Sequence, residues 1–77
     1  MDTKQAINLL TSEFHTWSHV VFDNADSHQQ DAIEDLELTI GFLRKCAKSE
    51  QTNPDWLSKR YAMARKQLDI LKGAIGG

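Results

Sequence analysis

Two histidines one helical turn apart are the first residues whose types and spacing suggest chemistry. His15 and His19 stand in the stretch FHTWSHVVF, among large apolar residues. In a helix, a spacing of four lets both imidazole rings reach one metal ion. A zinc site needs a third or fourth ligand fixed nearby, and no other histidine or cysteine stands at a recognisable spacing. We therefore predict no metal site here and expect both histidines to be exposed.

Three carboxylates further along the chain suggest a second kind of chemistry. Asp31, Glu34 and Glu37 recur every three residues, which places them on one side of a helix, where they could hold magnesium. A metal-dependent nucleotide hydrolase of this kind needs a second acidic cluster on a neighbouring helix, and the last third of the chain has only Asp55 and Asp69. Acidic residues early in a helix also complement its dipole. The hydrolase stays an alternative, and we expect a protein that is not an enzyme and needs no cofactor.

Cysteine usage and hydropathy indicate the compartment. Cys46 is the single cysteine, so no disulfide framework is available, which fits a reducing environment. We expect its thiol to be a small filler beside the core. No apolar run approaches the roughly 20 residues that a membrane span needs. The first residues, MDTKQAINLL, lack the pattern of a signal peptide. We expect a cytoplasmic protein with no membrane partner.

The elements that must position these residues follow one helical period. Turn and cap residues interrupt the chain at Asp23–Ser27 and at Ser49–Pro54. The sequence predicts a single helical domain over residues 1–77, with helices at about 3–22, 27–48 and 54–75. We expect the second helix to start after Asp26 or Ser27; the second of these starts makes Ser27 the cap, with Gln30 reaching back to it. We expect Asn53 to cap the third helix.

Apolar residues alternately three and four positions apart predict the core side of each helix. Loops of about five residues favour antiparallel neighbours, so the predicted fold class is all-α. It is either a three-helix bundle or a helical hairpin with a third helix laid against it. The predicted core residues are Ile7, Leu10, Phe14, Trp17, Val21, Ile33, Leu36, Ile40, Leu43, Ala47, Leu57, Tyr61, Ala64, Leu68, Leu71 and Ile75.

A second set of large apolar residues lies off these stripes. Its members are Leu38, Phe42, Trp56, Met63 and Ile70. Gly41, beside Phe42, would permit a close backbone approach. One explanation is a splayed bundle that buries both sets within one chain. The other is association with a copy of the chain or with another protein, since exposed apolar patches usually mark interaction surfaces. We favour association, and a two-fold homodimer is its commonest form.

The charge distribution leaves one further alternative. The last third of the chain is basic, and Lys59, Arg60, Arg65 and Lys66 could form a nucleic-acid face. The net charge of the whole chain is −2, which disfavours non-specific binding to phosphate chains. The leading interpretation is a non-enzymatic interaction module, a small regulator or inhibitor that masks a surface of a larger partner protein. Size and composition are typical of small accessory proteins, including those of phages and other mobile elements.

Overall fold

Three long helices and one short 3-10 segment make up the computed structural model, which describes residues 2–75. Helix α1 spans Thr3–Val21 and continues into the 3-10 segment η1, Phe22–Asn24. Helix α2 spans Ser27–Lys48, and α3 spans Pro54–Ile75. None of residues 2–75 lies in a β-strand. The all-α prediction is therefore confirmed, and the helices begin and end within about one residue of the expected positions.

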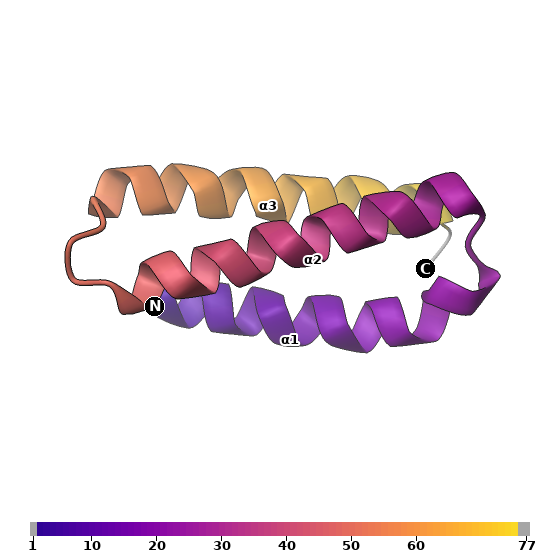
Figure 1. Cartoon of the computed structure of the whole chain (residues 1–77), viewed down its shortest axis with the longest axis horizontal. Helices are drawn as coiled ribbons and strands as arrows, with labels where there is room; N and C mark the ends of the chain where they lie inside the picture. Colours follow the sequence, from indigo (N-terminus) through magenta and orange to yellow (C-terminus); the bar gives the residue numbers. More distant parts are fainter. Residues whose placement is uncertain (1, 76–77) are drawn as a thin grey trace.

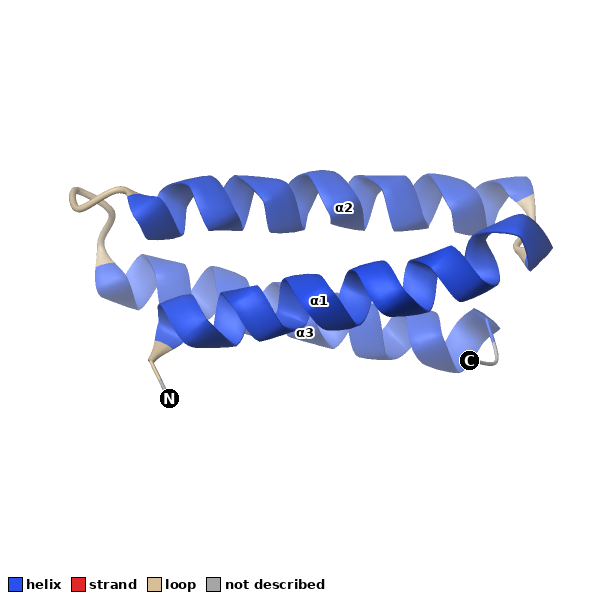
Figure 2. Ribbon diagram, turned by 90° about the horizontal axis from the view of Figure 1, so that it is seen from below, coloured by secondary structure: helices blue, strands red, loops and turns tan. Residues whose placement is uncertain are grey.

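The helices lie side by side along one long axis, and consecutive helices run in opposite directions (Figure 1). The turned view shows the same arrangement, with α1 and α3 below α2 (Figure 2). Each helix packs against both of the others. The architecture is thus a three-helix bundle rather than a hairpin with an added helix. Its extents are 39 × 21 × 17 Å, so the molecule is about twice as long as it is wide.

Reciprocal caps fix the starts of the first two helices. The Asp2 carboxylate accepts a hydrogen bond from the backbone N–H of Gln5 at 2.8 Å, and the Gln5 side chain accepts one from the backbone N–H of Asp2. Asp26 and Gln29 repeat this arrangement at 2.8 and 3.1 Å. Each pair satisfies donors that the helix itself leaves free.

Of the two starts that the sequence leaves open for α2, the structure has the one after Asp26. Asp26 is the cap, and Ser27 is the first helical residue. A carboxylate at this position interacts more favourably with the positive end of the helix than a hydroxyl does. Gln30 does not reach back to the cap but donates to the carbonyl of Phe22 at 2.9 Å, which ties η1 to α2.

The start of α3 is as predicted. The side-chain oxygen of Asn53 accepts hydrogen bonds from the backbone N–H groups of Asp55 and Trp56, at 2.8 and 3.2 Å. Pro54 occupies the first helical position, where its missing N–H costs nothing. This cap sets the direction in which α3 leaves the loop, and with it the position of Trp56 beside α2.

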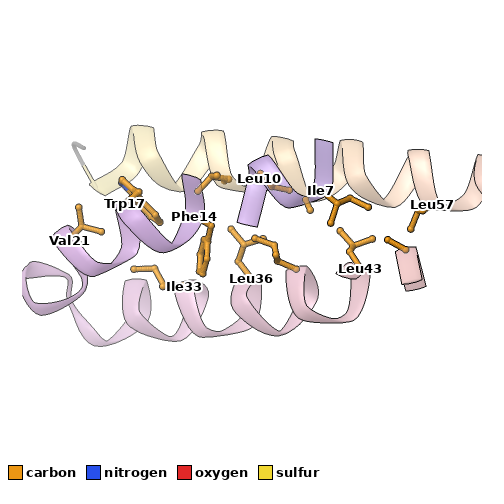
Figure 3. Packing of buried hydrophobic residues seen from close by; sticks show 13 residues of the cluster. Ile7, Leu10, Phe14, Trp17, Val21, Ile33, Leu36, Leu43 and Leu57 are labelled. Carbon is orange, nitrogen blue, oxygen red and sulfur yellow. The ribbon is translucent and has the colours of Figure 1, made fainter. Parts of the chain in front are cut away.

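Thirteen buried apolar side chains fill the space between the helices (Figure 3). Every one belongs to the predicted stripes: Ile7, Leu10, Phe14, Trp17, Val21, Ile33, Leu36, Ile40, Leu43, Ala47, Leu57, Ala64 and Leu68. Tyr61, Leu71 and Ile75 were also expected in the core but are only partly buried at its edge. α3 thus buries a narrower stripe than α1 or α2.

Two polar groups inside the core were not expected. Thr11 is buried, and its hydroxyl donates to the carbonyl of Ile7 at 2.8 Å. This bond satisfies a group that would otherwise be costly to bury. The indole N–H of Trp17 is buried without a partner. Within residues 2–75, no helix combines the length and the apolar character that crossing a bilayer requires.

Candidate protein-interaction surface

Four of the five apolar residues that the sequence left off the stripes are exposed. The exposed fractions are 74% for Leu38, 57% for Phe42, 59% for Met63 and 54% for Ile70. A splayed bundle that buries both sets is therefore not what the chain forms. We call the surface made by Leu38, Phe42, Trp56, Met63 and Ile70 the α2–α3 face, after the two helices that supply it.

Trp56 differs from the other members of this face, because it is half-buried and packs against the core. The sequence predicted a residue wholly off the core. Trp56 is the third residue of α3, close to the loop that joins α2 to α3, and there its side chain packs against the core. Because Trp56 is only partly buried and also contacts the ring of Phe42, it joins the core to the exposed apolar residues.

A stacked cluster lies at this point of the face. The rings of Phe42 and Trp56 meet edge to face, with centroids 6.2 Å apart and an interplanar angle of 82°. The guanidinium carbon of Arg60 lies 5.3 Å from the centre of the Trp56 ring. Edge-to-face rings and an arginine over a tryptophan are both favourable contacts. The cluster gives the face a preformed centre, even though Phe42 remains more than half exposed.

Two shallow hollows extend the face along the boundary between α2 and α3. One is lined by Leu38, Thr39, Phe42, Leu43, Trp56 and Arg60. The other is lined by Ala32, Asp35, Leu36, Thr39, Arg60, Met63, Ala64, Gln67 and Leu71. Thr39 and Arg60 line both, so the hollows form one groove. Ile70 lies outside this lining but follows Met63 by seven residues, on the same side of α3.

The opposite side of α3 carries an ion-pair network with α1. Glu13 accepts hydrogen bonds from Arg65 at 2.9 Å and from Lys72 at 3.1 Å, and Arg65 also pairs with Asp69 at 3.2 Å. The hydrogen bond from Arg65 lowers the pKa of the Glu13 carboxyl; partial burial opposes this, and the bond from Lys72 adds to it. The same hydrogen bond raises the pKa of Arg65. Sequence reasoning missed this network.

The network divides the candidate nucleic-acid residues. Lys59, Arg60 and Lys66 are exposed. Arg65 is only partly exposed, and its guanidinium is held between two carboxylates. Arg60 lies over Trp56 on the α2–α3 face. The four cations therefore do not form one free basic surface.

The His15–His19 pair and two of the three candidate carboxylates of α2 line a different hollow, and Asp31 lies outside its lining. His15, His19, Glu34 and Glu37 border one hollow between α1 and α2. Both histidines are exposed, as their positions predict, and the ring of His15 meets that of Phe14 edge to face. In the described part of the chain, no three His, Cys, Asp or Glu side chains are placed so that they could hold a metal ion.

Two smaller expectations concern α2. Gly41 was expected to permit a close backbone approach, but no atom beyond its own helical surroundings lies within 4 Å of the position of a Cβ. Gly41 is exposed, so no part of the described chain uses the close approach that this glycine permits. Cys46 is partly buried and packs against the core, in keeping with the filler role that its position beside the stripe predicts.

The comparisons with known proteins give no relative. The chain matches no protein-family model, and no curated protein and no solved structure is significantly similar to it.

Proposed function

We propose that this chain is a non-enzymatic protein-interaction module, a small regulator or inhibitor that uses the α2–α3 face to cover a surface of a larger protein. The carrying observation is the Phe42–Trp56–Arg60 cluster beside exposed Leu38 and Met63. Burying these side chains against a partner would gain roughly 25 cal/mol for each Å² of apolar surface removed from water. The role also fits the small accessory proteins that the size and composition suggest.

The residue types on this face support the proposal. Tryptophan, phenylalanine, methionine and arginine are enriched at the centres of protein interfaces. A few such residues supply most of the binding energy. Phe42 and Trp56 already contact each other in the free chain, so little ordering of these rings is left to be done on binding, which favours affinity. The same face also suits a two-fold homodimer, which would bury it against itself.

A pull-down with matched variants tests this function. The tagged chain serves as bait in a cell extract, beside a double variant, Leu38→Ala with Met63→Ala. The control is Leu9→Ala with Val20→Ala, which removes two apolar side chains that are 59% and 70% exposed on α1. We expect a larger protein to bind the wild type and the control but not the face variant. A partner that binds all three equally contradicts the proposal.

Nucleic-acid binding through Lys59, Arg60 and Lys66 is the second candidate, and their exposure is the observation that favours it. Arg65 contributes less, because its charge is already paired with Glu13 and Asp69. A gel-shift titration at several salt concentrations separates the two functions. Binding to phosphate chains weakens steeply as salt rises, whereas an apolar interface is far less sensitive to salt.

The hydrolase alternative finds little support in the geometry. Asp31, Glu34 and Glu37 are exposed on α2, and no second acidic group joins them to complete a metal site among residues 2–75. Turnover of a nucleotide that requires magnesium would revive this alternative.

A further inference from the structure

Charge is divided unevenly along the length of the bundle. Because α2 runs opposite to α1 and α3, residues 2–12 and 38–64 form one half, and residues 13–37 and 65–75 form the other. The first half holds six lysines and arginines against three acids, a formal charge of +3. The second holds three against eight, a formal charge of −5. The 39 Å bundle therefore has a basic half and an acidic half.

The α2–α3 face extends over both halves. Leu38 and Met63 lie at the boundary between them, Trp56 lies in the basic half and Ile70 in the acidic half. Trp56 and Ile70 are each seven residues from Met63, which is about 10 Å in either direction along α3. A rotation by half a turn about an axis near Leu38 and Met63 therefore exchanges the positions of Trp56 and Ile70.

We propose that the occupant of the α2–α3 face is a second copy of this chain, reversed end for end, with the two-fold axis near Leu38 and Met63. This inference rests on the proposed interaction role of that face: the copy and the larger protein compete for it, and the larger protein binds by displacing the copy. In the reversed dimer, α2 lies along α2 of the copy and α3 along α3 of the copy, in opposite directions. Trp56 faces the copy's Ile70, and each acidic half lies against a basic half.

Charge complementarity selects this orientation. In a dimer whose copies point the same way, the two acidic halves (−5 each) face each other and the two basic halves (+3 each) face each other. Both contacts are repulsive. The reversed dimer also pairs groups at the groove. Asp35 and Arg60 line the same hollow; Asp35 is three residues from Leu38 and Arg60 is three residues from Met63, on opposite sides of the axis. The rotation therefore brings the copy's Arg60 to the level of Asp35.

The size of the face suits this partner. The bundle is 39 Å long and 21 Å wide, so a copy lying along its whole length has an outline of the order of the roughly 800 Å² per partner that a stable interface buries. A second copy is present wherever the chain itself is present. Both copies expose the same apolar residues, so one contact covers both sets.

Sedimentation equilibrium of charge-swapped variants tests the orientation. Asp35→Lys and Arg60→Glu, both at exposed positions, should each weaken the dimer about five-fold or more, because each change occurs twice in a two-fold dimer. The double variant carries both changes and should recover to within about two-fold of the wild type. Far-UV circular dichroism shows that each variant is folded.

The other outcomes distinguish the orientation from the function. In a dimer whose copies point the same way, the copy's Lys66 lies at the level of Asp35, because Lys66 is three residues from Met63 and Asp35 is three residues from Leu38, both toward the acidic half. If Asp35→Lys is restored by Lys66→Glu instead of Arg60→Glu, the copies therefore point the same way and the reversed dimer is overturned. A wild type that stays monomeric at about 100 μM overturns self-association, while the pull-down still decides the proposed function. A dimer that survives Met63→Glu, which sets two carboxylates beside the axis, overturns the use of this face in both proposals.

Discussion

The rings of Phe42 and Trp56 meet edge to face with centroids 6.2 Å apart, and they join two helices outside the buried core. Phe42 is exposed, whereas Trp56 is anchored on core residues. The pair therefore connects the stable interior to a surface that remains apolar. Truncating the one ring and truncating the other should have different consequences, because only Trp56 contributes to the core.

Core and face variants should separate in thermal melts. Leu36→Ala and Leu68→Ala each remove a buried side chain and should cost about 2–5 kcal/mol of unfolding free energy. Phe42→Ala should cost less than about 1 kcal/mol, as at surface positions, and Trp56→Ala should fall between them. The melts need one fixed protein concentration, because association raises apparent stability. A Phe42→Ala variant as unstable as Leu36→Ala would show that Phe42 belongs to the core.

Acid should weaken the contact between α1 and α3. The pKa of Glu13 lies below its unfolded value because Arg65, and then Lys72, donate hydrogen bonds to it. The ion pairs therefore stabilise fully above about pH 4.3 and lose their effect as the pH falls through the lowered pKa. Glu13→Gln should cost about 1 kcal/mol or less at pH 7, since these side chains are about one third exposed.

Unfolding by urea at several pH values measures this difference. The gap between wild type and Glu13→Gln should close as the pH falls toward 3, well below the ordinary value for glutamate. Glu50→Gln, in the exposed loop after α2, is the matched control and should show almost no gap at any pH. A Glu13→Gln gap that is constant from pH 7 to 3 would contradict the assigned role of the carboxylate.

His15 and His19 should be dispensable for folding. Both are exposed, so changing both to glutamine should shift the unfolding free energy by less than about 0.5 kcal/mol. The measurement is urea unfolding together with metal analysis of the purified protein. Stoichiometric metal that survives a chelator and disappears in the double variant would reverse this conclusion.

Gly41→Ala should stabilise the chain. Gly41 lies within α2 and has open space where a Cβ would stand, so the alanine meets no clash. Replacing glycine by alanine inside a helix is worth about 0.5–1 kcal/mol. Gly73→Ala, near the end of α3 with equally open surroundings, should give a smaller gain because helix ends fray. A loss of stability at Gly41 would show that the small residue is needed there.

The stripes of the sequence predicted the core well, because one period of three and four residues governs each helix. Ile7, Phe14 and Leu43 are buried for that reason. The starts of helices depend on individual hydrogen bonds, and two adjacent residues, Asp26 and Ser27, both have cap chemistry. Only the geometry shows that the Gln29 side chain completes a cap on Asp26.

Contacts between distant residues could not be predicted in this way. Glu13 meets Arg65 and Lys72 across more than fifty residues of sequence, and three charges on two helices can pair in several ways until the rotation of each helix is known. The same limit explains Trp56. The spacing of Trp56 from Met63 and Ile70 predicts a side chain on the outer side of α3. In the structure, Trp56 lies close to the loop before α3, and its side chain packs against the core.

Sedimentation equilibrium of the wild type beside a face variant and an α1 variant tests the central claim most directly. The face variant is Leu38→Ala with Phe42→Ala, and the matched control is Leu9→Ala with Val20→Ala, which alters apolar residues that are exposed to a similar degree. We expect the wild type and the control to sediment at twice the mass of the chain, and the face variant at the mass of one chain with its helical signal intact. The contradicting result is a wild type that sediments as a monomer together with a Phe42→Ala variant that melts as early as Leu36→Ala.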